Sequence, residues 1–399
     1  MQLTHKIALK PTDSQREYFN RAAGTARLVW NWGLAEWNRQ YAEGLKPKAM
    51  ELKKQFNQIK YIEYPWLCEM HRDSHAQPFA NLAKAWQRFF SDKKRNKQSY
   101  KPRFKKKGKA KDSFYVANDK FRLEGQEIIL PKIGKVKLCE TLRFEGKILG
   151  ATVSRTANRW FIAIQVEVPE QIAIKKRNAD GIVGVDLGIT AAATLSTGEK
   201  IISPKPLAKA MRRLQIRQRH VSRKTDSTNR KKSSGRLAKL HARIANLRAD
   251  FTHKLTTRLC CENQTIVIED LHVKGMLANH KLARAINDVG FGAIRQQLEY
   301  KSKRYKTNLI IADRWYPSSK LCSYCGFKQE KLALKDREWE CPSCQIQHDR
   351  DINAANNLKG LATPTALPVA NFLATEDTVL RNLLGRVGKV TPVSYECGQ

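Results

Sequence analysis

The sequence lacks any apolar run of about 18 residues, and its opening segment, MQLTHKIALKPTDSQ, has no apolar stretch. A membrane-spanning helix needs about 20 predominantly apolar residues. A secretory signal needs a positively charged start followed by an apolar core of about 7–15 residues. Both absences predict a cytoplasmic protein with no membrane partner.

Acidic residues are scarce. The chain has 37 Asp and Glu against 74 Lys and Arg, which gives a formal net charge of +37. The excess positive charges repel one another and do not help the chain to fold. The usual explanation for such a charge is a polyanionic partner that neutralises it. An acidic membrane surface is the competing explanation, and the lack of long apolar runs weighs against it. The charge therefore predicts a nucleic-acid partner.

Internal repeats are also absent, and at about 150 residues per domain the 399 residues indicate two or three domains. Most of the nine cysteines follow no pattern, except for two C-x-x-C pairs that are separated by fifteen residues. Four thiolates at this spacing indicate a zinc ribbon, with one Zn²⁺ held tetrahedrally. Since cysteine fills all four positions, the zinc is predicted to be structural. The ligands are Cys322, Cys325, Cys341 and Cys344.

The first 170 residues alternate between strand and helix patterns. QLTHKIALK reads as a strand, and residues 10–92 carry helical periodicity that is broken near YIEYPWLCEM. Asp13 or Ser14 is expected to cap the first helix. From about 113 to 170, period-2 alternation with turn residues predicts an antiparallel barrel or sheet, which the opening strand completes.

The pattern after residue 181 is mixed. GIVGVDLGITAAATLSTGEKII predicts two strands around a glycine turn, and 205–254 predicts two helices around the turn TDSTNRKKSSG. The strand QTIVIED, a helix near 289–305 and the strand NLIIADRW follow. This alternation favours a mixed α/β layer fold. The tail after about 362 has no firm period and is expected to be disordered.

Two basic segments are candidates for contact with nucleic acid. Residues 93–111 carry eleven positive charges and no acid, with aromatic residues interleaved, and 205–254 carries sixteen Lys and Arg against two acids. A solvated linker or surface hairpin is the simpler interpretation of such runs. One-sided charge beside stacking rings favours phosphate and base contact instead. The candidate residues are Lys93, Lys94, Arg95, Tyr100, Arg103, Phe104, Lys105, Arg212, Arg213, Arg217, Arg219, Arg223, Arg236 and Arg243.

Three acids stand in apolar surroundings. Asp186 ends the apolar run 182–185, and Glu269 ends TIVIE. If a helix spans about 351–359, Asp351 shares its apolar face with the alanines at i+3 and i+4, although it could instead be the N-cap. Asp349 lies in the loop before this helix. Three converging carboxylates suit hard divalent cations, and two such ions can assist an in-line phosphodiester displacement.

The motifs GVDLGIT, VIEDL, YPSSKLCSYCG, CPSC and HDRDINAANN, in this order and spacing, resemble the transposon-encoded TnpB family, which is related to the type V CRISPR effector nucleases. The resemblance covers nearly the whole chain and is most specific from 181 to 358. It places the catalytic acids on Asp186, Glu269 and Asp351, where they would bind two Mg²⁺ ions.

The resemblance implies a multidomain α+β chain with an RNase H-like (RuvC) nuclease domain, an inserted zinc ribbon, an antiparallel oligonucleotide-binding-like wedge domain and a helical recognition domain. The expected boundaries are 1–9 and 113–175 for the wedge domain, 10–112 for the recognition domain with its basic linker, 180–317 and 348–362 for the nuclease domain with the basic insertion 205–254, 318–347 for the ribbon, and 363–399 for the tail.

The implied activity is cleavage of double-stranded target DNA guided by a noncoding RNA from the transposon end, by a protein that is monomeric in its ribonucleoprotein. The protein itself would read a short motif beside the target, with Gln77 among the reading residues. A bacterial or archaeal, nucleoid-associated location follows. The alternatives are a nuclease-inactive RNA-guided repressor, and a transposase that uses the same acids for strand transfer. A zinc-ribbon RNA-binding protein without catalysis would leave the acids unexplained.

Overall fold

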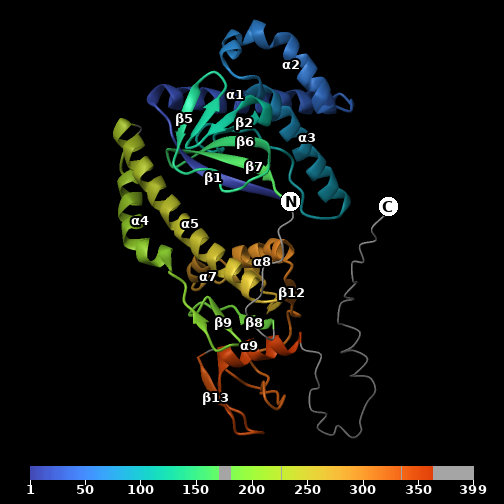
Figure 1. The fold of residues 1–399 in the computed structure, drawn as a ribbon, viewed down its shortest axis with the longest axis vertical. Coiled ribbons are helices and arrows are strands. Elements are labelled where there is room, and N and C mark those ends of the chain that lie inside the picture. The colour runs from blue at the N-terminus through green and yellow to red at the C-terminus, as the bar shows by residue number, and fades with distance from the viewer. Residues whose placement is uncertain (170–180, 226, 334, 363–399) are drawn as a thin grey trace. The chain divides into compact units, whose positions relative to one another are not determined.

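The computed structural model of the chain describes residues 1–169, 181–225, 227–333 and 335–362 (Figure 1). As far as these residues go, the chain forms two compact units, Met1–Ala173 with Lys209–Leu247 and Ile174–Ala208 with Arg248–Gln399. The mixed α and β composition expected from the sequence is confirmed. The predicted disordered tail, 363–399, lies outside the described residues. In the described part, no helix has the length and apolar character that crossing a membrane requires.

The first unit contains a seven-stranded sheet in the order β2-β6-β7-β1-β5-β4-β3. Its strands are β1 (Gln2–Lys10), β2 (Ser113–Ala117), β3 (Arg122–Glu124), β4 (Glu127–Leu130), β5 (Gly134–Leu138), β6 (Lys147–Thr156) and β7 (Arg159–Glu167). The opening strand pairs antiparallel with β7 and with β5, as its alternation predicts. Alternate side chains such as Ile7 and Ile162 are fully buried, because a strand sends every second residue into the core.

Four helical segments lie between β1 and β2, namely α1 (Asp13–Ala42), α2 (Ala49–Glu63), the 3₁₀ turn η1 (Pro65–Glu69) and α3 (Arg72–Lys94). The expected N-cap of α1 at Asp13 or Ser14 is wrong. Thr12 is the cap, and its hydroxyl accepts a hydrogen bond from the backbone N–H of Gln15 while the Gln15 side chain accepts from the backbone of Thr12. Thr12 is the last residue with an extended backbone before the helix, and it completes a reciprocal capping box with Gln15.

The second unit is built on a five-stranded sheet in the order β10-β9-β8-β11-β12. Its strands are β8 (Ile182–Asp186), β9 (Ala193–Leu195), β10 (Lys200–Ile201), β11 (Thr265–Ile268) and β12 (Asn308–Ile311). β8, β11 and β12 are parallel, whereas β9 runs antiparallel to β8. The helices α6 (Val273–Met276), α7 (Ala283–Val289), α8 (Phe291–Tyr305) and α9 (Arg350–Gly360) and the hairpin β13 (Glu338–Glu340) and β14 (Gln347–Asp349) complete this unit.

Two helices, α4 (Pro206–Ser222) and α5 (Thr228–Glu262), contribute residues to both units. Both were expected, but the predicted turn 225–235 is wrong over most of its length, because α5 already begins at Thr228. The Ser227 hydroxyl accepts a hydrogen bond from the backbone N–H of Arg230 and so helps to start the helix early. Gly235 is accommodated inside the helix, at the modest cost that a single glycine carries.

Candidate active site

Two of the three predicted acids lie at the same edge of the second sheet. β8 and β11 are parallel neighbours, and Val185 is aligned with Ile268 in their register. Asp186 is the last residue of β8, and Glu269 directly follows β11. Their carboxylates therefore leave the carboxyl ends of adjacent strands at the same level, which is the edge where open α/β sheets usually bind ligands.

The third acid comes from α9, which packs on β8 at very close range. A Cβ atom on Gly184 would lie only 1.9 Å from the carbonyl oxygen of Ala355. The helix can therefore approach the strand only because glycine stands opposite its alanines, both of which are buried. Figure 1 shows α9 lying along β8 and β9. This packing brings the first turn of α9, with Asp351, to the strand end that carries Asp186.

The two aspartates of HDRDINAANN have different roles. Asp349 is the N-cap of α9, and its Oδ1 accepts hydrogen bonds from the backbone N–H groups of Asp351 and Ile352. Its other oxygen pairs with the ammonium of Lys200. Burial alone would raise the pKa of Asp349, but the hydrogen bond from Lys200 lowers this pKa below its usual value. The alternative that Asp351 caps the helix is therefore wrong.

The charges of Glu269 and Asp351 act on the carboxylate of Asp186. Burial, followed by the negative charges of Glu269 and Asp351, raises the pKa of Asp186 to about 8. Burial also raises the pKa of Glu269, although a hydrogen bond from the hydroxyl of Ser318 opposes this rise. Asp351 pairs with Arg337, whose Nη1 lies 3.4 Å from Oδ1. A site where carboxylates destabilise one another's charge is one where a bound cation relieves the repulsion.

The three acids of this edge fit a hard divalent cation such as Mg²⁺, because carboxylate oxygens are the ligands that such ions prefer. The three carboxylates are less tightly gathered than the ribbon thiolates. Within the described ranges, the four cysteines form the one group of ligand atoms that all lie within 4.8 Å of one another.

That cysteine group contains the four predicted zinc ligands. The Sγ atoms of Cys322 and Cys344 are 3.6 Å apart, as are those of Cys325 and Cys341. A tetrahedron with Zn–S bonds of about 2.3 Å has edges of about 3.8 Å, so the thiolates fit zinc. Gly326 follows the first pair at a φ of +78°, which glycine adopts without strain.

The sequence reasoning missed one residue beside this centre. His348 is nearly buried, and its Nε2 lies 3.0 Å from the Sγ of Cys322. Its ring packs against Trp339. The C-x-x-C spacing gives no signal for it, and only its place directly before the capping Asp349 could have drawn attention to it. His348 therefore links the metal-ligating loop to the start of α9.

The predicted nucleic-acid contacts of the first basic segment differ in exposure. Those exposed to solvent are Lys93, Lys94, Arg95, Tyr100, Arg103 and Phe104. Lys105 is different, because its ammonium lies 3.7 Å from the ring centroid of Trp30 and its backbone N–H donates to the side chain of Asn31. Burial lowers the pKa of Lys105. The structure thus gives Lys105 a packing role within the first unit.

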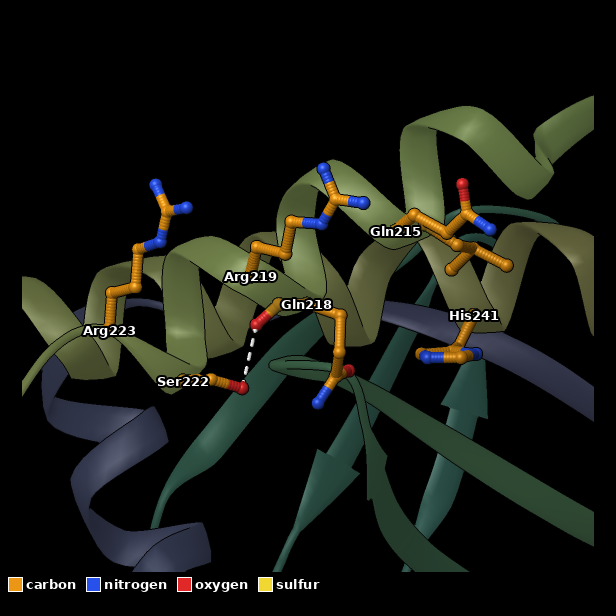
Figure 2. Close-up of a pocket in the computed structure, with 7 residues that line it drawn as sticks. Gln215, Gln218, Arg219, Ser222, Arg223 and His241 are labelled. Atoms are coloured by element: carbon orange, nitrogen blue, oxygen red, sulfur yellow. Dashed lines mark hydrogen bonds between the residues drawn. The ribbon is translucent and has the colours of Figure 1, made fainter.

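The predicted contacts of the second basic segment lie on α4 and α5, except Arg223, which directly follows α4. The exposed ones are Arg212, Arg213, Arg219, Arg223, Arg236 and Arg243. Arg217 is half-buried, since its guanidinium donates to the carbonyl oxygen of Arg236 and so ties α4 to α5. A hollow of about 500 Å³ lies between these helices, and Figure 2 shows Arg219 on α4 and Arg223 just after it beside the hollow, with His241 on α5. The exposed arginines are free to meet phosphates.

Gln77 lies on α3, in the wall of a cavity of about 100 Å³ that also involves the start of β2. Its amide donates to the side chain of Asn81 at 3.4 Å. Tyr115 and Thr152 line the same cavity from the sheet. Gln77, the predicted motif-reading residue, therefore lines a small cavity together with polar side chains of α3 and of the sheet.

Comparison with known proteins assigns the segments of this chain to described families. Residues 163–280 match the OrfB_IS605 model, described as a probable transposase, and residues 291–358 match the Cas12f1-like TNB domain. Residues 1–46 match the helix-turn-helix domain that belongs to OrfB_IS605 proteins.

The chain is similar to curated proteins over most of its length. It is 39% identical over 360 residues to a putative RNA-guided DNA endonuclease of Streptomyces pristinaespiralis, with 88% of this chain and 87% of the relative covered. It is 30% identical over 371 residues to the putative RNA-guided DNA endonuclease InsQ of Escherichia coli K12, with 88% and 90% covered.

Solved structures resemble the chain more distantly. CasPhi-2 (Cas12j) bound to crRNA aligns at 11% identity and a TM-score of 0.44, over 92% of this chain and 99% of that one. The Cas12f1–sgRNA–target DNA complex aligns at 14% identity and a TM-score of 0.34, over 90% and 99%.

Proposed function

The chain belongs to the family of OrfB_IS605 proteins and putative RNA-guided DNA endonucleases, the TnpB-like group expected from its motifs, and on that premise we propose that it cleaves DNA at sites selected by a bound guide RNA. The observation that carries the proposal is the meeting of Asp186, Glu269 and Asp351 at one sheet edge. A protein that only bound nucleic acid would have no use for a buried aspartate whose charge two neighbouring acids oppose.

The three acids are the proposed catalytic residues and the ligands of two Mg²⁺ ions. When bound, the ions supply Lewis-acid stabilisation of the negative charge that develops during phosphodiester hydrolysis. Asp186 and Glu269 offer their carboxylates from fixed strand ends, and Asp351 offers its own from the first turn of α9. Asp349 keeps that turn in place by capping it. One Zn²⁺ held by the four cysteines stabilises the ribbon.

The strand order supports an RNase H-like (RuvC) assignment for the second unit. Its central strand, β8, lies between antiparallel β9 and parallel β11, and the acids come from β8, the end of β11 and a helix that packs on β8. The antiparallel seven-stranded sheet supports an oligonucleotide-binding-like wedge domain, and α1 to α3 support a recognition domain inserted between β1 and β2. These domain assignments are part of the proposal.

The proposed partners are a guide RNA from the transposon end and double-stranded target DNA. Base pairing would read the target, so the protein needs broad phosphate contact rather than one groove-reading helix. The exposed arginines of α4 and α5 and the basic segment after α3 supply that contact. The cavity that contains Gln77 is the proposed reader of the short motif beside the target.

Sequencing the RNA that copurifies with the protein from its native locus tests the guide. We expect one dominant noncoding RNA, and the purified complex should cut a plasmid that carries the matching sequence. Removal of the RNA should abolish cutting at that sequence. Equal cutting with and without RNA would refute RNA guidance, and binding without cutting would favour the nuclease-inactive repressor. Joined rather than cleaved DNA ends would favour the transposase.

A further inference from the structure

A chain of partly buried polar contacts joins the zinc ribbon to the candidate active site. Two asparagines of α9, Asn353 and Asn357, stand four residues apart and therefore lie on one face of the helix. Both side chains reach the segment that leads into the first cysteine pair. The amide of Asn353 donates to the carbonyl oxygen of Leu321 at 2.6 Å, and its oxygen accepts the backbone N–H of Ser323 at 2.9 Å.

Asn357 holds the same segment one turn further along. Its amide donates to the carbonyl oxygens of Ser318 and Leu321, both at 2.7 Å. The two asparagines thus fix the backbone on both sides of Leu321, immediately before Cys322. Because Asn353 is 1% exposed and Ser318 is 4% exposed, water cannot replace these bonds cheaply.

The third member of the chain of contacts is Ser318. Its carbonyl oxygen is held by Asn357, and its hydroxyl donates to Oε1 of Glu269 at 2.6 Å. The segment that Asn353 and Asn357 fix is therefore the one that orients a candidate catalytic carboxylate. We call the side chains of Ser318, Asn353 and Asn357 the ribbon clasp.

We propose that the ribbon clasp is a positioning device through which the zinc ribbon sets the geometry of the catalytic cation site. Ser318 fixes the Glu269 carboxylate, and the asparagines join the loop of Ser318 to the helix that carries Asp351. The proposal deepens the proposed function and rests on it, because it takes the acids to be cation ligands.

The expected consequence follows from how carboxylate ligands behave. A ligating carboxylate that loses its hydrogen-bonding partner keeps its charge but not its orientation, and such losses typically weaken metal affinity by about 10–100-fold. The clasp should therefore act on cation affinity rather than on the maximal rate at saturating cation. A group that served stability alone would change the melting temperature and leave cation affinity unchanged.

The test uses Mn²⁺ as the probe, titrated into the zinc-loaded, RNA-free full chain and followed by electron paramagnetic resonance. The RNA is omitted because its phosphates also bind Mn²⁺. We expect Ser318→Ala to weaken Mn²⁺ binding about tenfold. The neighbouring Ser319→Ala is the matched control and should bind like the wild type. In the RNA-loaded enzyme, Ser318→Ala should raise the Mg²⁺ concentration for half-maximal cleavage, with the rate recovering at high Mg²⁺.

A second pair of variants covers the case in which Ser318→Ala loses zinc or melts early. Ser318→Thr and Ser318→Val have side chains of nearly the same size and differ in the hydroxyl group. We expect the Thr variant to retain Mn²⁺ affinity and the Val variant to lose it, with one zinc per chain in both. On α9, Asn357→Ala should weaken Mn²⁺ binding while Asn356→Ala does not.

Failure of this inference can be distinguished from failure of the proposed function. Asp186→Asn should abolish Mn²⁺ binding at this site if the acids are cation ligands. Unchanged Mn²⁺ binding in Asp186→Asn would overturn the proposed function together with the clasp. Lost binding in Asp186→Asn combined with wild-type affinity in Ser318→Ala and Ser318→Val would overturn the clasp alone.

Discussion

At the scale of single residues, the molecule separates a structural aspartate from a chemical one only two positions away. Asp349 satisfies backbone N–H groups at the start of α9 and pairs with Lys200, so its charge is compensated. The charge of Asp351 acts on Asp186, and its Oδ1 lies 3.4 Å from Nη1 of Arg337. Because Asp349 accepts hydrogen bonds from two N–H groups at the helix start, the carboxylate of Asp351 is not needed as a helix cap.

This difference predicts opposite outcomes for two substitutions. Asp351→Asn keeps the size of the side chain but removes its charge, and it should abolish DNA cleavage while RNA binding is retained. Asp349→Ala removes the cap and should lower the free energy of unfolding by about 1 kcal/mol, with cleavage reduced but measurable. Cleavage assays on the RNA-loaded variants, together with thermal melts, check both. Full cleavage by Asp351→Asn would contradict the assignment of the triad.

Gly184 provides a second residue-scale prediction. A Cβ atom there would meet the backbone of α9 at 1.9 Å and 2.6 Å, so Gly184→Ala must displace the helix from β8. We expect a loss of about 1–3 kcal/mol in unfolding free energy and a loss of cleavage.

Gly292 is the matched control for this experiment. It lies in α8 with no heavy atom within 4 Å of an added Cβ. Gly292→Ala should leave cleavage intact and stabilise the chain by about 0.5 kcal/mol, because alanine favours the helix. Equal effects of the two substitutions in urea melts would show that the close packing of α9 on β8 is unimportant.

At the scale of elements, the ribbon is a small hairpin with little apolar core of its own. Its buried cluster consists of Trp339 and two of the cysteines, with partly buried residues around them. A module of this kind depends on its metal for folding. Because α9 begins directly after β14, the order of the ribbon also affects the start of the catalytic helix.

Replacing a zinc ligand should therefore affect more than the ribbon. Cys322→Ser is expected to lower the zinc content from one per chain to near zero and to lower the melting temperature of the second unit. Cys139→Ser, at an exposed cysteine outside the ribbon, is the control and should change neither quantity. Atomic absorption and calorimetry on the same preparations measure both. A zinc-loaded Cys322→Ser chain with an unchanged melt would contradict the ribbon assignment.

The N-terminal end of α3 predicts a pH dependence. His75 is 4% exposed, and burial, with the nearby charge of Lys60, lowers its pKa to about 4. In the unfolded chain the imidazole of His75 has a pKa of 6.5, so it takes up a proton more readily there than in the folded chain. The contribution of His75 to stability is therefore fully present above pH 6.5 and is lost as the pH falls towards 4. The loss attributable to His75 is up to about 3 kcal/mol.

Urea unfolding of the wild type and of His75→Gln at pH 7 and pH 4.5 measures this contribution. Gln does not titrate, so the variant should lose less stability on acidification than the wild type. His71, whose pKa burial also lowers, remains in both proteins and contributes equally to their pH dependence. Parallel losses in the two proteins would exclude His75 as a source of acid sensitivity.

At the scale of the whole molecule, the net charge of +37 makes stability depend on salt and on the partner. Without RNA the positive charges repel one another, and salt screens this repulsion. With RNA bound, the same salt weakens the phosphate contacts.

We therefore expect opposite salt effects in the two states. Raising NaCl from about 50 to about 300 mM should raise the melting temperature of the RNA-free chain and lower that of the RNA complex. Differential scanning fluorimetry on matched samples tests this. The same direction of shift in both states would mean that the excess charge is not neutralised by the RNA.

The sequence determined a great deal of this protein by itself. The cysteine spacing predicted the zinc cluster, period-2 alternation predicted the strands of the first sheet, and the apolar runs before Asp186 and Glu269 located two strand ends. These features are local, because a hydrophobic period or a ligand spacing can be recognised within a short stretch of the sequence. Local boundaries were less certain, as the true cap at Thr12 and the early start of α5 illustrate.

Which side chains meet is a property of the folded chain. It separated Asp349 from Asp351, withdrew Lys105 into packing with Trp30, placed His348 beside Cys322 and joined Ser318 to Glu269. None of these pairings follows from periodicity, since their partners are distant in the chain or share no repeating pattern. The approach of α9 to β8 is likewise a tertiary feature, and it is possible only because Gly184 carries no side chain.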